Sequence, residues 1–154
     1  MINLKDVITI KIPYPDLEND LALTAHMYIC IKRNINTLYF VQCQRVKLYM
    51  KKSNYKDIKN FIDEEPNIQR NPFKFETRIN CDKLFFTKSS RYDNALKTNP
   101  GISNELYESI MDKLNNNQND IEEIHLDEEK LWEINKRFTA LKKISTIYTI
   151  RLIY

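Results

Sequence analysis

Hydrophobic and polar positions alternate at the start of the chain. Within 7–12 every second residue is an isoleucine, and this period of two predicts a β-strand with one buried face. Residues 27–32 and 37–43 are apolar at most positions, which predicts two strands that are more fully buried. The asparagines within 33–36 predict a hairpin turn between these strands. Alternation returns in 45–52, so a further strand is expected there.

The middle of the chain changes period twice. Apolar residues recur at helical spacing over 54–65, and Pro66 ends the short helix that this spacing predicts. Residues 73–81 then give the cleanest alternation in the chain, with Arg78 on the polar face, and predict a long strand. The apolar run 84–87 is expected to continue the same sheet.

The last third predicts two helices and a final strand. Ser103 is a suitable N-cap for the first helix and Asp127 for the second, with a polar linker at 115–120 between them. The apolar stripe of the first helix consists of Leu106, Tyr107, Ile110, Met111 and Leu114. The stripe of the second consists of Leu131, Ile134, Phe138 and Leu141. The apolar alternation of 146–154 predicts a terminal strand that pairs with the sheet or with a second subunit.

This order of elements indicates a mainly β fold of the α+β class. Short sequential strands favour a small barrel, closed or half-closed. We expect one domain over 1–154. In it, 1–114 form the barrel core with a short inserted helix and the following helix, and 120–154 add a C-terminal helix and strand.

Composition removes several classes of function. The chain has 154 residues, a net charge of +3 and a single glycine, so it has no glycine-rich loop to cradle a phosphate. Cys30, Cys43 and Cys81 are too widely spaced for a zinc site or a disulfide framework, and we expect reduced, buried thiols. No metal or cofactor is expected. We expect no signal peptide, and the sequence has no apolar run near the ~18 residues of a membrane span, so a cytoplasmic protein without a membrane partner is expected.

Four segments carry motifs whose order and spacing agree with one known family. They are LKDVITIKIPYPDL (4–17), INCDK (79–83), KSSRY (88–92) and ISNELYESIMDKL (102–114). Together they resemble the PemK/MazF family of bacterial toxins. The resemblance implies an SH3-like barrel, usually a homodimer, that cleaves single-stranded RNA without a metal and is inhibited by a cognate antitoxin. It also implies that 13–26 is the loop on the substrate side.

The chain departs from the family's pattern at the positions that carry its chemistry. Where the family has an arginine–proline pair, this chain has Ala25 and His26. Where the family often has threonine and serine, it has Gln44 and Arg45. Where some members have an arginine and then an acid, it has Phe85 and Thr87. The family's usual catalytic residues therefore do not carry over, and any cleavage must use other groups.

Metal-free RNA cleavage requires a base, an acid and cations around the phosphate. His26 is a candidate acid or base, and Arg45 is a candidate phosphate ligand with bidentate geometry. Thr87 follows a strand and is a candidate contact to backbone phosphate. Each has a plainer interpretation: a structural histidine at a strand end, a solvent-facing arginine, and a turn residue.

A basic run with interleaved aromatic residues gives the candidate RNA-binding residues. They are Lys47, Tyr49, Lys51, Lys52 and Lys88. Cations follow phosphates and aromatic rings stack on unpaired bases, although exposed lysines also simply keep proteins soluble. Two other interpretations stay open: a nucleic-acid-binding barrel without catalysis, and a protein-interaction module.

Overall fold

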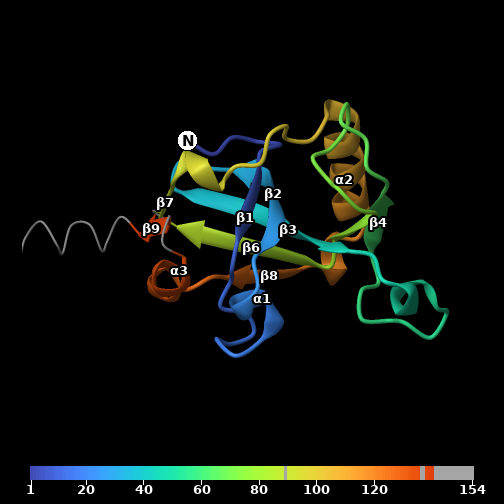
Figure 1. Ribbon diagram of the computed structural model, residues 1–154, viewed down its shortest axis with the longest axis horizontal. Helices are drawn as coiled ribbons and strands as arrows, with labels where there is room; N and C mark the ends of the chain where they lie inside the picture. Colours follow the sequence, from blue (N-terminus) through green and yellow to red (C-terminus); the bar gives the residue numbers. More distant parts are fainter. Residues whose placement is uncertain (89, 136–137, 141–154) are drawn as a thin grey trace, which may run out of the picture.

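The computed structural model describes residues 1–88, 90–135 and 138–140, and Figure 1 shows their arrangement. The fold is mixed α+β, with an open, mostly antiparallel sheet and, in the described residues, three α-helices. The strands are β1 (Val7–Ile10), β2 (His26–Arg33), β3 (Thr37–Arg45), β4 (Phe61–Glu64), β5 (Thr77–Asn80), β6 (Lys83–Lys88), β7 (Ser90–Tyr92), β8 (Glu122–His125) and β9 (Phe138–Ala140). The α-helices are α1 (Asp20–Leu23), α2 (Asn104–Asn116) and α3 (Glu128–Ile134). Short 3-10 helices are η1 (Leu48–Lys51), η2 (Asn94–Leu96) and η3 (Gln118–Asp120).

The main sheet is built around β3. Its order is β1-β2-β3-β5-β4, and β6 also pairs with β3 and carries β8 as a parallel neighbour. Along the edge of β3 that faces away from β2, β5 pairs with its last residues and β6 with its first. Between β5 and β6 the chain leaves the ladder at Asp82, whose carboxylate accepts backbone N–H bonds from Lys59 at 2.6 Å and Asn60 at 2.9 Å. The sheet therefore divides there into two branches.

Both faces of the sheet are buried at its centre. On one face Phe40 and Phe85 belong to the same core as Leu131 of α3. On the other face Val41 belongs to a core that includes Leu106 of α2. Figure 1 shows α2 and α3 at opposite corners of the sheet. Apolar side chains on both faces explain why β2 and β3 read as continuous apolar runs.

Several predicted elements are confirmed. β2 and β3 occupy the two buried strands expected at 27–32 and 37–43, joined by a short turn. β1 confirms the first alternating strand, and α2 begins after Ser103, whose hydroxyl accepts the N–H of Leu106 at 3.2 Å. The α+β class is confirmed.

Two predictions between residues 45 and 65 are wrong. Residues 45–52 leave the sheet after Arg45 and form a loop with η1, in which Leu48 is 86% exposed. The helix expected over 54–65 is absent, and β4 stands at its end because Ile62 pairs with Ile79 of β5. Pairing with a neighbouring strand overrides a helical apolar spacing this short.

The strand expected at 73–81 is shorter than predicted, whereas the continuation of the sheet expected at 84–87 is confirmed by β6. Residues 73–76 are a loop before β5, and β6 begins only after the break at Asp82. Arg78 lies buried and not on a solvent face. All four residues of β5 are buried, so both faces of this strand are covered. The alternation of apolar and polar residues along it therefore does not separate a buried face from an exposed one.

The C-terminal predictions are partly corrected. The segment 122–125 forms the strand β8. The sequence does not predict this strand, because the segment EEIH has no apolar alternation. Asp127 caps α3 as predicted, but the helix ends at Ile134, and Phe138 lies in β9 instead of continuing the helical stripe. Leu141 and the strand predicted at 146–154 lie outside the described residues.

Candidate nucleic-acid interface

Four of the predicted site residues line one hollow where β2 begins and β3 ends. This hollow measures about 470 Å³, and a second of about 400 Å³ adjoins it across Arg45. We call the two together the Arg45 cleft. Its charged and aromatic lining residues are Asp20, His26, Arg45, Lys47, Tyr49, Lys74 and Phe75. Lys74 and Phe75 come from the loop before β5 and are not among the predicted site residues.

The imidazole of His26 has a partner at each nitrogen. Its Nδ1 lies 2.9 Å from the carbonyl oxygen of Thr24, so in the neutral ring Nδ1–H donates there and Nε2 holds the lone pair. Nε2 lies 3.5 Å from the Asp20 carboxylate, which becomes its ion-pair partner when the ring is protonated. Asp20 is well exposed on α1. The lone pair of Nε2 is the arrangement that a general base needs.

Strand geometry separates His26 from Arg45 within the cleft. Met27 of β2 lies directly opposite Cys43 of β3, so these two side chains share a face of the sheet. Side chains alternate along each strand, so Arg45 shares that face while His26 points to the other. His26 and Arg45 therefore approach the cleft from opposite faces of the sheet.

Arg45 and its aromatic neighbours form the exposed part of the cleft. The guanidinium carbon of Arg45 lies 3.8 Å from the centre of the Phe75 ring, which is a stacked cation–π contact. Phe75 is 51% exposed and Tyr49 is 53% exposed, so both rings present large areas to solvent. Tyr49 packs edge-on against Tyr55 with ring centres 5.7 Å apart. Positively charged side chains and exposed aromatic rings therefore lie together at the mouth of the cleft.

The buried side chain of Arg78 holds one side of the cleft in place through three hydrogen bonds. Its Nε and Nη2 donate to the Asp63 carboxylate at 2.7 and 2.8 Å, and Nη1 donates to the carbonyl of Met50 at 3.0 Å. Hydrogen bonding to Asp63 raises the pKa of Arg78. Since Met50 lies in η1, Arg78 ties the segment that carries Tyr49 to β4 and β5.

The predicted lysines of this segment differ in their surroundings. Lys51 Nζ lies 2.7 Å from the Glu76 carboxylate, and this hydrogen bond raises the pKa of Lys51. Glu65 hydrogen-bonds the same Glu76, which raises the pKa of Glu65. Lys47 and Lys52 are exposed. The positive charge of Lys51 is therefore paired with the Glu76 carboxylate. Lys47, in contrast, lines the cleft and is the lysine of this segment best placed to contact a ligand there.

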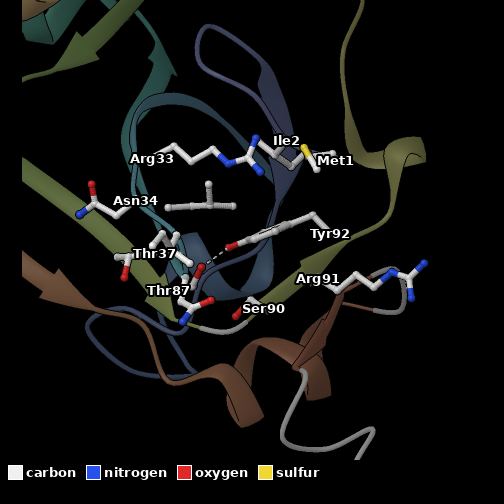
Figure 2. A pocket seen from close by; sticks show the side chains of 12 residues that line it. Met1, Ile2, Arg33, Asn34, Thr37, Thr87, Ser90, Arg91 and Tyr92 are labelled. Carbon is white, nitrogen blue, oxygen red and sulfur yellow. Dashed lines mark hydrogen bonds between the residues drawn. The ribbon is translucent and has the colours of Figure 1, made fainter.

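Thr87 lies near the opposite end of β3, beside a separate pocket of about 380 Å³. Figure 2 shows its hydroxyl facing that of Tyr92, 2.9 Å away. Thr87 pairs with Leu38, and Arg45 stands seven residues further along β3. At 3.3 Å per residue this is ~23 Å, so Thr87 does not reach the Arg45 cleft. Lys88 adjoins Thr87 and lies equally far away.

The cysteines are buried and free, as predicted. Burial raises the pKa of Cys30 and of Cys81 to about 12, and it raises that of Cys43 as well. Near neutral pH these thiols stay protonated, which makes them poor nucleophiles and poor metal ligands. In the part of the chain that the structure describes, no group of three or more histidine, cysteine or acidic side chains is placed to hold a metal ion. Among the helices described, none has the length and apolar character to cross a membrane.

In comparisons with known proteins, the chain matches no family model, no curated protein and no solved structure. The resemblance to PemK/MazF toxins therefore rests on its sequence motifs. The first motif forms β1 and the loop leading to α1, and Thr9 in it lines the Arg45 cleft. The loop 13–26 that the resemblance assigns to the substrate side contributes Asp20, Thr24 and His26 to the same cleft.

Proposed function

We propose that the chain binds single-stranded RNA in the Arg45 cleft. The observation that carries this proposal is the Arg45 guanidinium stacked on the exposed Phe75 ring, with the exposed Tyr49 ring and Lys47 on the same cleft. Cations that follow the phosphates and rings that stack on unpaired bases are the two features of single-strand recognition. Lys74 adds a further positive charge beside Phe75.

The salt dependence of RNA binding tests this proposal. Arg45→Gln combined with Lys47→Gln removes two cations from the cleft, and the salt slope of binding to a single strand should fall by about 0.7 for each phosphate that is no longer neutralised. The measurement is fluorescence anisotropy of a labelled single-stranded RNA over a range of salt concentrations. Arg91→Gln combined with Lys130→Gln is the matched control, because it also removes one exposed arginine and one exposed lysine, both outside the cleft. Equal slopes in the cleft variant and the control contradict the proposal.

The second candidate function is RNA cleavage by a PemK/MazF-like toxin. The motifs in 3–114 favour it, and so does His26, whose Nε2 lone pair lies beside the well-exposed Asp20. In this proposal the sheet corresponds to an SH3-like barrel, and the protein is a cytoplasmic homodimer that an antitoxin inhibits. The division of the sheet at Asp82, where β3 passes from β5 to β6, is compatible with strands that bend around a barrel.

Cleavage is tested separately from binding. A positioned acid or base contributes about 10²–10⁴-fold, so His26→Ala should lose that much activity on single-stranded RNA in EDTA while its melting temperature stays nearly unchanged. Asp20→Asn keeps the imidazole and removes only its acidic neighbour, so it should retain cleavage that His26→Ala loses. If the unchanged protein binds RNA and cleaves none, the binding proposal stands and the toxin proposal fails. If it neither binds nor cleaves RNA, a protein-interaction module becomes the better hypothesis.

A further inference from the structure

Three aromatic rings stand in a row across neighbouring strands, far from the Arg45 cleft. Tyr39 of β3 pairs with Phe86 of β6, and Phe86 pairs with His125 of β8. The Tyr39 and Phe86 ring centres are 5.3 Å apart. The Phe86 and His125 rings are 5.1 Å apart and nearly parallel, at 19°. We call these three residues the ring ladder.

Lysines extend the ring ladder on the same face of the sheet. Lys32 of β2 pairs with Tyr39, and its Nζ lies 5.0 Å from the centre of that ring. Lys88 follows Phe86 by two residues, and its Nζ lies 5.9 Å from the Phe86 ring. Both lysines are exposed. Two acidic residues lie on the His125 side: Glu123, two residues before His125 on β8, and Glu128, which contacts the His125 ring.

The ring ladder lies at the margin of the core that includes α2, and its Tyr39 ring packs against that core. Further along the same face, Val41 and Leu84 are buried in the core with α2, whereas Tyr39 and Phe86 are half-buried and the side chain of His125 is 47% exposed. Cross-strand aromatic pairs stabilise a sheet, and the partial exposure of these rings also leaves them accessible to a ligand.

Glu128 holds the end of the ladder in place. Its Oε1 lies 2.8 Å from His125 Nε2 and accepts the backbone N–H of Lys88 at 2.7 Å. One carboxylate at the start of α3 therefore fixes both the His125 ring and the strand end that carries Lys88. A rigid ring loses little conformational freedom when a ligand stacks on it.

We propose that the ring ladder is a second surface for single-stranded RNA, on which unpaired bases stack while Lys32 and Lys88 contact the phosphates. Rings on adjacent strands, flanked by cations, are how sheets bind unpaired bases without reading sequence. Tyr39 lies six residues before Arg45 on β3, which is ~20 Å, so the ladder and the Arg45 cleft are separate surfaces. The two proposals can therefore succeed or fail independently.

The test compares a strand that has bases with one that has none. Phe86→Leu keeps an apolar side chain and removes the ring, and His125→Ala removes the exposed end of the ladder. In a protein that already carries Arg45→Gln and Lys47→Gln, so that the cleft does not mask the ladder, each should weaken binding of a labelled oligouridine by about 5- to 150-fold, the range found for loss of one stacking ring. Binding of an abasic ribose-phosphate strand of the same length should be the same for the ladder variants and for the protein that carries the two cleft substitutions alone. Phe75→Leu makes the same substitution in the Arg45 cleft and reports on that surface alone.

The outcomes separate base stacking from charge attraction and from misfolding. A base-dependent loss in both ladder variants supports the proposal, whatever Phe75→Leu does. Unchanged oligouridine binding in His125→Ala and Phe86→Leu overturns it, and so does an equal loss with the abasic strand. Thermal melts identify a Phe86→Leu protein that is misfolded, in which case the exposed His125→Ala variant decides the matter alone.

Discussion

The β2–β3 hairpin and the segment 46–76 are held in place by different forces. The hairpin is buried on both faces by apolar contacts, and Ile29 and Val41 have no exposed surface. Hydrophobic burial of this kind depends little on pH or on salt. It makes the hairpin the rigid part of the sheet.

The segment 46–76 has apolar anchors of its own, the buried Met50, Ile58 and Phe73, but it also carries several charged links that the hairpin lacks. Its principal links are Arg78 to Asp63, Lys51 to Glu76, and Arg70 to Glu64, in which Arg70 Nε and Nη2 each donate to Glu64 at 2.9 Å. This segment also supplies Lys47, Tyr49, Lys74 and Phe75 to the Arg45 cleft. The comparison indicates that the candidate site lies on a loop region held by ion pairs together with a few apolar anchors, next to a scaffold held by apolar packing.

Ile29→Ala should have the largest effect on stability and the smallest on the cleft. Truncation of a fully buried isoleucine costs about 2–5 kcal/mol of unfolding free energy, because apolar burial is reduced and a cavity remains. Urea unfolding at low and high salt should give the same loss. The folded variant should bind RNA as the unchanged protein does. A loss that changes strongly with salt shows that the hairpin is not held by apolar contacts alone.

Arg78→Met should destabilise the protein by about 3 kcal/mol, toward the low end of the range for a broken buried ion pair. The side chain of Arg78 is 3% exposed but that of Asp63 is 25% exposed, so water partly solvates the carboxylate that is left unpaired. Unlike Ile29→Ala, this variant should also weaken RNA binding, because η1 loses its hydrogen bond at Met50.

A double variant separates the two causes. Arg78→Met with Asp63→Leu leaves no unpaired charge, so urea unfolding should show part of the stability restored. RNA affinity should stay low, because the bond to the Met50 carbonyl is still missing. Full recovery of binding in the double variant indicates that Arg78 does not position η1.

The same contrast explains which elements the sequence predicts. β2, β3 and α2 follow from apolar periodicity because their side chains pack against the core at regular intervals. The segment 46–76 does not, since ion pairs such as Arg78 with Asp63 join residues far apart in the sequence and leave no periodic trace. Alternation assigns Arg78 to solvent, although β5 is buried on both faces.

The candidate surfaces are predictable to different degrees. Of the eight site residues that sequence reasoning selects, His26, Arg45, Lys47 and Tyr49 line the Arg45 cleft. The other four, Lys51, Lys52, Thr87 and Lys88, do not. Sequence reasoning misses Phe75 because alternation places that residue on the inward face of a strand that begins two residues later. It misses the ring ladder because the ladder needs the register of three strands, one of which, β8, has a polar sequence that predicts no strand.

Glu65→Gln should have the smallest effect, with a sign set by pH. The hydrogen bond to Glu76 raises the pKa of Glu65 in the folded protein, so the folded state holds this proton more tightly than the unfolded chain does. As pH rises through the range between the two pKa values, the unfolding free energy falls, and above that range the two carboxylates repel each other. The variant should therefore melt slightly higher than the unchanged protein at neutral pH, and this gain should vanish at acidic pH, where Glu65 is protonated in both states. Glu76→Gln is the matched control, because it also removes the partner of Lys51 and should give no gain at neutral pH. A gain for Glu65→Gln that persists in acid shows that the Glu65 charge is not its source.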